Sequence, residues 1–271
     1  IEADQDNYDL VEDEFGRAYV NKNTGERYGS VTSFVDGKEG GDFKGDPNLK
    51  QTAFNIGNMI EGIVADFFNG TVAAYSDYSD RISKEDYSDI VEQLRDIKAF
   101  AEKKGYSIVT KPLVIADDNN KIAGQPNLLM FDREGNAYIY DIISKRNKDG
   151  KNDFRQIMSK KWNGVSQLDK SSGKMNLYGD IMENKFDIPV KGVGLIPFEV
   201  DYEVAKDGDG YKVDTVIQHK RIDFKRKNYI RDEQAGTKNE GVSKDTGKNE
   251  KRPETKREPK TKLPKFPTDR R

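Results

Sequence analysis

The sequence of 271 residues contains no cysteine and only one histidine, His219. Without cysteine there are no disulfide bonds, no zinc sites built on thiolates and no catalytic thiols. One histidine cannot supply the several imidazoles of a multi-histidine metal site. His219 lies in the strand-like segment 216–221, and we expect it to be an ordinary exposed side chain.

The sequence also has no long apolar run. A membrane-spanning helix needs roughly 20 consecutive apolar residues, and no segment approaches that length. No signal-peptide pattern is visible. We therefore expect no membrane partner, no secretion by a signal peptide, and a cytoplasmic or virion-associated location.

Charged residues make up 35% of the sequence and hydrophobic residues 34%, and the charges are unevenly distributed. Residues 231–271 contain thirteen Lys or Arg, eight Asp or Glu and only four apolar residues. So few apolar side chains cannot offset the entropy of ordering the chain. The sequence predicts a low-complexity basic tail over 231–271, disordered or extended, with a net charge of +5. It follows a domain over 1–230 whose net charge is −7. We expect protein partners to hold this tail.

The remaining residues alternate between helical and strand-like patterns. Apolar periodicity predicts long helices over 53–68, 84–104 and 173–184, a short helix after Ser30, and a helical region over 154–162. Strand-like runs cover 8–20, 106–116, 122–131, 137–144, 190–200 and 211–224. This order predicts an α/β fold with a mixed central β-sheet flanked by helices.

Four segments carry a resemblance to a known family. They are, in order, Gly57–Glu61, Ile122–Leu129, Tyr138–Ser144 and Lys174–Tyr178. Together they resemble the PD-(D/E)XK nuclease superfamily, in the branch that contains RecB-like and phage exonuclease domains. The resemblance covers roughly residues 25–200 and implies a restriction-endonuclease-like fold.

The resemblance also implies a metal site. A phosphodiester repels hydroxide, so such nucleases place Mg²⁺ between carboxylates and the scissile phosphate. Glu61 matches the family's helix glutamate and Asp141 its strand acid, which makes them the implied metal ligands. The family's metal-binding aspartate falls on Asn127, which is neutral. Its catalytic lysine falls on Ile143, which can neither donate a hydrogen bond nor carry charge.

Two lysines stand near these altered positions. Lys145 follows Ile143 by two residues, on the same strand face. It is a candidate substitute for the catalytic lysine, but the sequence favours an ordinary surface lysine. The family's glutamine falls on Lys174, four residues before Tyr178 and on the same helix face. The resemblance implies that Lys174 and Tyr178 contact the nucleic acid.

The altered positions predict a catalytically inactive nuclease-fold protein. It would bind nucleic acid, with DNA favoured over RNA, or serve as a component of a phage assembly. Its cofactor, if it has one, would be Mg²⁺. Two alternatives stay open: an active Mg²⁺-dependent DNA nuclease or an inactivated form of one, and a structural or cargo protein of a virion docked by its tail.

Overall fold

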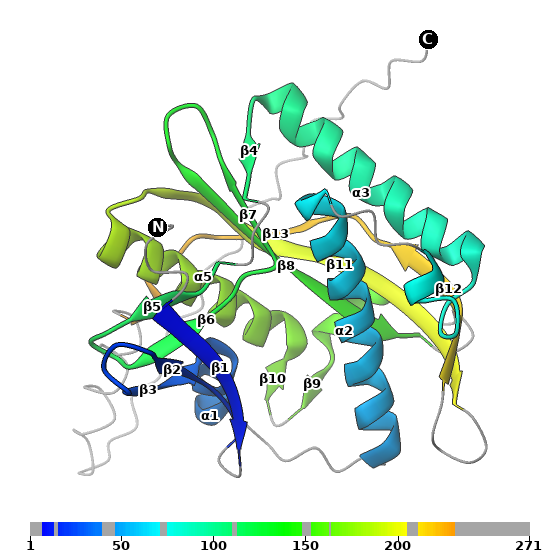
Figure 1. Ribbon diagram of the computed structural model, residues 1–271, viewed down its shortest axis with the longest axis horizontal. Coiled ribbons are helices and arrows are strands. Elements are labelled where there is room, and N and C mark those ends of the chain that lie inside the picture. The colour runs from blue at the N-terminus through cyan, green and yellow to red at the C-terminus, as the bar shows by residue number, and fades with distance from the viewer. Residues whose placement is uncertain are drawn as a thin grey trace, which may run out of the picture.

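The computed structural model describes residues 7–13, 16–39, 47–70, 75–109, 113–147, 153–162, 164–204 and 211–230. The predicted tail over 231–271 lies outside these residues. Within them, the chain forms two β-sheets flanked by helices (Figure 1). The predicted mixed α/β class is confirmed.

The larger sheet has the strand order β12-β11-β8-β7-β4, and β13 also pairs with β11. Its strands are β4 (Ser107–Ile108), β7 (Leu128–Phe131), β8 (Ala137–Arg146), β11 (Val190–Val204), β12 (Tyr211–Gln218) and β13 (Ile222–Phe224). β8 and β11 run parallel, with Asp141 beside Leu195, while the other pairs are antiparallel. Helix α5 (Gln167–Phe186) lies in the connection between the two parallel strands, as a parallel pair requires.

Helices cover both faces of this sheet. Side chains alternate between the faces along a strand. On β8, Tyr140 and Ile142 pack in one core cluster with α2 (Pro47–Asn69) and α3 (Lys84–Lys104). Ala137 and Ile139 pack in a second cluster with α5. The sheet therefore separates α2 and α3 from α5 (Figure 1).

The smaller sheet has the order β1-β2-β3-β6-β5. Its strands are β1 (Tyr8–Asp13), β2 (Gly16–Asn21), β3 (Arg27–Ser30), β5 (Ile115–Asp117) and β6 (Ile122–Gly124). Helix α1 (Val31–Glu39) follows β3, and the Ser30 hydroxyl accepts a hydrogen bond from the Ser33 amide at 2.9 Å. The short helix predicted after Ser30 is therefore present, with the expected cap. The remaining elements are η2 (Tyr75–Asp77), α4 (Phe154–Ser159), β9 (Lys161–Trp162) and β10 (Val165–Ser166).

Helix α3 has the predicted boundaries because both ends carry local signals. The Ser83 side chain accepts from the Asp86 amide, and Gly105 ends the helix with a φ of 71°. The other two long helices begin earlier than predicted. α2 begins at Pro47 and α5 at Gln167, each at least one turn before the expected start.

The predicted strands over 106–116 and 122–131 are wrong as continuous elements. Each splits and gives one short strand to each sheet: β4 and β5 from the first, β6 and β7 from the second. In the second, the break falls at Gln125–Asn127, where Pro126 has no amide to donate to a ladder. The predicted helix over 154–162 ends at Ser159, because Lys161–Trp162 pair with Val165–Ser166 as a short hairpin.

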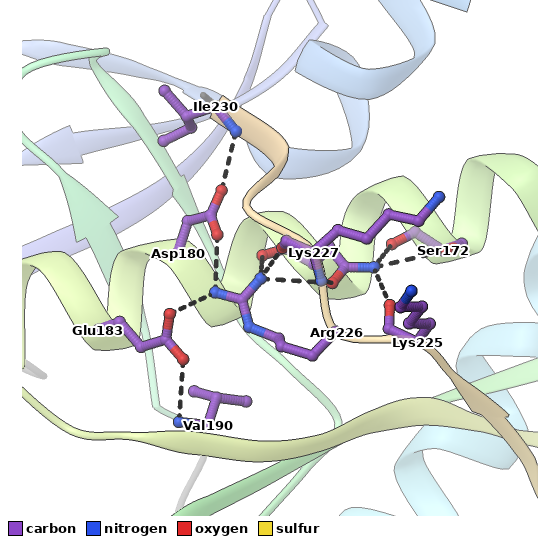
Figure 2. A network of polar contacts seen from close by, with 9 residues as sticks. Ser172, Asp180, Glu183, Val190, Lys225, Arg226, Lys227 and Ile230 are labelled. Carbon is purple, nitrogen blue, oxygen red and sulfur yellow. Dashed lines mark hydrogen bonds and ion pairs between the residues drawn. The ribbon is translucent and has the colours of Figure 1, made fainter. Parts of the chain in front are cut away.

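After β13 the chain lies against α5 (Figure 2). Arg226 Nη2 lies 2.7 Å from both Asp180 Oδ1 and Glu183 Oε2. The Ile230 amide donates to Asp180 Oδ2 at 2.9 Å, and the Lys227 amide donates to Asn176 Oδ1 at 2.6 Å. Residues 226–230 are thereby fixed to the helix. None of the helices over the described ranges has the length and apolar character that crossing a membrane would require.

Candidate functional site

The candidate site centres on an ion pair between β8 and α5. Lys174 Nζ lies 2.6 Å from Asp141 Oδ2, and the two side chains are 23% and 11% exposed. Asp141 faces α5 because it has the same strand parity as Ile139. Burial alone would lower the pKa of Lys174, but the charge of Asp141 opposes it, and the net pKa lies above its ordinary value. The lysine therefore remains an ammonium, tightly paired with the carboxylate.

Asn127 lies next to this pair, at the point where β7 begins. Its side-chain oxygen accepts a hydrogen bond from the Ile142 amide at 2.9 Å. Ile142 directly follows Asp141, so Asn127 is linked to the strand that carries the carboxylate. The amide side chain supplies the acceptor that a β7 backbone carbonyl would supply farther along the ladder.

Glu61 approaches from α2. It lines a cavity of about 210 Å³ together with Asn127, Gln125 and Pro126. Its charge also contributes to the raised pKa of Lys174. The structure thus brings Glu61, Asn127, Asp141 and Lys174 into one region, from four separate elements or their ends.

Tyr178 lies one helical turn after Lys174, and the ammonium sits 5.9 Å from its ring centre. The tyrosine is only 2% exposed, and burial raises the pKa of its hydroxyl. A side chain on Gly124 would place its Cβ 2.6 Å from the Tyr178 hydroxyl oxygen, so glycine makes room for the ring. In this structure Tyr178 packs against β6 and supports the site from the core.

Ile143, at the position of the expected catalytic lysine, belongs to an apolar cluster. It packs with Phe154 and Met158 of α4 and with Leu168 of α5. An aliphatic side chain in such surroundings cannot orient a water molecule. The structure gives Ile143 a packing role.

Lys145 is half-buried on β8 and is not an ordinary surface lysine. Burial and the nearby charge of Lys170 lower its pKa. Its neighbour in register on β11 is Glu199, whose carboxylate is bound by Asn147 and His219 at 2.9 and 2.6 Å. Among the described residues no carboxylate pairs with Lys145. Lys145 thus lies close to the positive charge of Lys170, on the face of β8 that carries Asp141.

The sequence did not identify Lys170 or the surroundings of His219. The expectation that His219 is an ordinary exposed side chain is wrong, because its ring is bonded to Glu199 and stacks on Phe154 with centroids 4.4 Å apart. The spacing in the sequence could have identified Lys170, because a residue four positions before Lys174 lies on the same face of the helix.

No protein-family model matches this chain, and no curated protein matches it. One solved structure to which it is similar comes from Eubacterium rectale and is described as a "putative exonuclease". The two share 13% sequence identity, and the superposition has a TM-score of 0.36 over 77% of this chain and 76% of that one.

The side chains of the site do not fit a Mg²⁺ ion, which the family resemblance implies. Over the part of the chain that the structure describes, no three Asp, Glu or His side chains gather closely enough to hold a metal ion. The Asp141 carboxylate already holds an ammonium. At an effective dielectric constant of about 20, a divalent ion 4 Å from that ammonium would meet a repulsion of about 8 kcal/mol. Asn127 adds no negative charge to compensate.

Proposed function

We propose that this chain is a nuclease-like protein that binds nucleic acid, DNA in preference to RNA, without hydrolysing it. One observation carries the proposal: the carboxylate expected to hold a catalytic metal is paired with Lys174 at 2.6 Å. The order of the four sequence segments, and the meeting of Glu61, Asn127 and Asp141 in one region, support the relation to nucleases.

Loss of hydrolysis follows from the charge and the polarity of the site. Attack on a phosphodiester needs positive charge on the phosphate oxygens and a group that orients the water. Lys174 is engaged with Asp141, and Ile143 lies in an apolar cluster. Neither Lys174 nor Ile143 meets these requirements.

Contact with nucleic acid is assigned to Lys145 and Lys170. They lie on the same face of the sheet as Asp141, and the charge of Lys170 is close enough to lower the pKa of Lys145, so the two lysines place positive charge where a phosphate backbone could bind. Two phosphate contacts contribute to affinity without specifying a sequence.

Binding is tested by fluorescence anisotropy with labelled single-stranded DNA, duplex DNA and RNA at several salt concentrations. We expect Lys145→Gln with Lys170→Gln to weaken binding and to reduce the salt slope by about two. Lys98→Gln with Lys103→Gln removes two exposed lysines from α3 and is the charge-matched control. Equal binding by the double variant and the control would contradict the assignment.

Hydrolysis is tested on the same substrates with Mg²⁺ or Mn²⁺. We expect no cleavage above the background of the Asp141→Ala variant. The alternative, an active nuclease, is favoured by one observation: Lys145 has a lowered pKa and lies on the strand face of Asp141. Cleavage that is lost in both Asp141→Ala and Lys145→Met would establish that alternative.

The tail over 231–271 is proposed to bind a protein partner, because it has too few apolar residues to join the core of the domain. The attraction between its charge of +5 and the domain's charge of −7 is screened at physiological salt and does not fix its path. Deleting it should leave the melting temperature of the domain unchanged while abolishing co-assembly with the native partner. A lower melting temperature after deletion would show instead that the tail stabilises the domain.

A further inference from the structure

The Lys174 ammonium lies near the two carboxylates, Asp141 and Glu61, that the family resemblance implies as metal ligands. The ammonium is bonded to Asp141 and close enough to Glu61 for that charge to raise its pKa. Glu61 belongs to α2, which lines the neighbouring cavity, and Asp141 belongs to β8 of the larger sheet. A single cation thus stands near carboxylates that come from α2 and β8.

We propose that the Lys174 ammonium is a built-in cation occupying a latent divalent-metal site formed by Asp141 and Glu61. The site accepts a metal ion only when the charge of Lys174 is removed.

The neutral side chain at position 127 suits a monovalent cation. Asp141, Glu61 and Lys174 together carry a net charge of −1. An aspartate at 127 would leave a net charge of −2 around one ammonium, in a region where Asp141 is only 8% exposed. Asparagine keeps the oxygen that the Ile142 amide needs without adding that charge. Asn127 and Lys174 are therefore matched to each other.

A tethered ammonium also behaves differently from a metal. It cannot dissociate, so the carboxylates stay compensated without any ion from solution. The structure of the site is then expected to be insensitive to chelators.

The experiment is a titration of the full-length chain with Mn²⁺ alone, with free Mn²⁺ measured by electron paramagnetic resonance. We expect wild type and Lys174→Arg, which keeps the charge, to bind no Mn²⁺ that depends on Asp141. Lys174→Gln should bind at least tenfold more tightly than wild type, with a Kd on the order of 10⁻³ M, as expected for few charged ligands. Adding Asn127→Asp should tighten binding by about another tenfold, and adding Asp141→Asn should abolish it.

The exposed Lys98→Gln is the control for a simple change in net charge, and it should behave as wild type. Folding of every variant is checked by circular dichroism. Mn²⁺ binding by wild type that Asp141→Asn removes would overturn the proposal, even if Lys174→Gln did not fold. Folded Lys174→Gln with Asn127→Asp that binds no better than wild type would overturn it as well.

Discussion

Helix α5 carries two ion-pair networks that differ in how deeply the central aspartate is buried. The outer network joins Asp180 and Glu183 to Arg226, and the inner site joins Lys174 to Asp141. Asp180 is fully buried, and both of its oxygens accept hydrogen bonds, from Arg226 and from the Ile230 amide (Figure 2).

The inner site is more open. Lys174 is 23% exposed and borders the region where Glu61 and Asn127 line a cavity. An ammonium has three donors, and the carboxylate of Asp141 takes one of them. The comparison indicates that the outer network stabilises the fold, whereas the inner site keeps polar groups near solvent.

Arg226→Ala should break the outer network with the largest loss of stability. It leaves the Asp180 charge buried without a cation, which typically costs about 3–5 kcal/mol of the free energy of unfolding. Lys225→Ala is the matched control, since Lys225 is exposed and contributes only its backbone carbonyl to Asn176. Urea denaturation measures both, and a loss below about 1 kcal/mol for Arg226→Ala would contradict the role given to this network.

The sequence singled out residues of the inner site but none of the outer network. The order of the segments that carry the family resemblance drew attention to Asp141 and Lys174, although their pairing, 33 residues apart, could not be predicted from spacing. Asp180 was missed because α5 is mostly apolar around it, and one acid in such a helix does not reveal its partner. The basic segment 225–227 gave the complementary signal, which becomes meaningful only once β13 directs the chain back to α5.

In the helices and the sheets as well, local signals were predictable from the sequence and long-range pairings were not. The boundaries of α3 were predictable because Ser83 and Gly105 act locally. The division of 122–131 between two sheets was not, because periodicity reports burial and not the sheet to which a strand belongs. Pro126 was the available sign of a break.

Asp141→Asn should destabilise the domain less than Arg226→Ala does. A hydrogen bond to a charged group contributes about 1.5–3 kcal/mol, and Lys174 can recover part of this by hydration because it is partly exposed. A double-mutant cycle with Lys174→Met isolates the pairwise energy. If Asp141→Asn lost as much free energy of unfolding as Arg226→Ala, the distinction between the two regions would be removed.

Gly124→Ala tests the packing that positions the inner site. The added Cβ would lie 2.6 Å from the Tyr178 hydroxyl oxygen and 2.8 Å from its ring, so we expect a cost of about 1–3 kcal/mol. Tyr178→Phe in the same chain removes the nearer atom and should recover part of the loss. Gly29→Ala, on the adjacent strand β3, is the control because its nearest contact would be at 4.0 Å. Thermal unfolding that ranks Gly29→Ala as the more damaging change would contradict this account.

The smallest expected effect concerns the start of α5, which both networks share. Ser166 and Asp169 form a capping box: the Ser166 hydroxyl accepts from the Asp169 amide at 3.1 Å, and the Asp169 carboxylate accepts from the Ser166 amide at 3.0 Å. Ser166→Ala should cost about 1 kcal/mol at neutral pH. Hydrogen bonds from the Ser166 hydroxyl and then its amide lower the pKa of Asp169.

Because the folded state lowers this pKa, the stabilisation from the Asp169 carboxylate is present above its unfolded value of about 3.9 and is lost as the pH falls through the folded value. The difference in stability between wild type and Ser166→Ala should therefore shrink below about pH 4. It should not vanish, because the bond from the Asp169 amide to the Ser166 hydroxyl does not titrate. Asp169→Asn keeps an acceptor but no charge, so its deficit should disappear at low pH. Urea denaturation from pH 7 to pH 3 measures both differences, and a Ser166→Ala deficit that stayed constant over that range would show that the carboxylate does not stabilise the start of α5 through its charge.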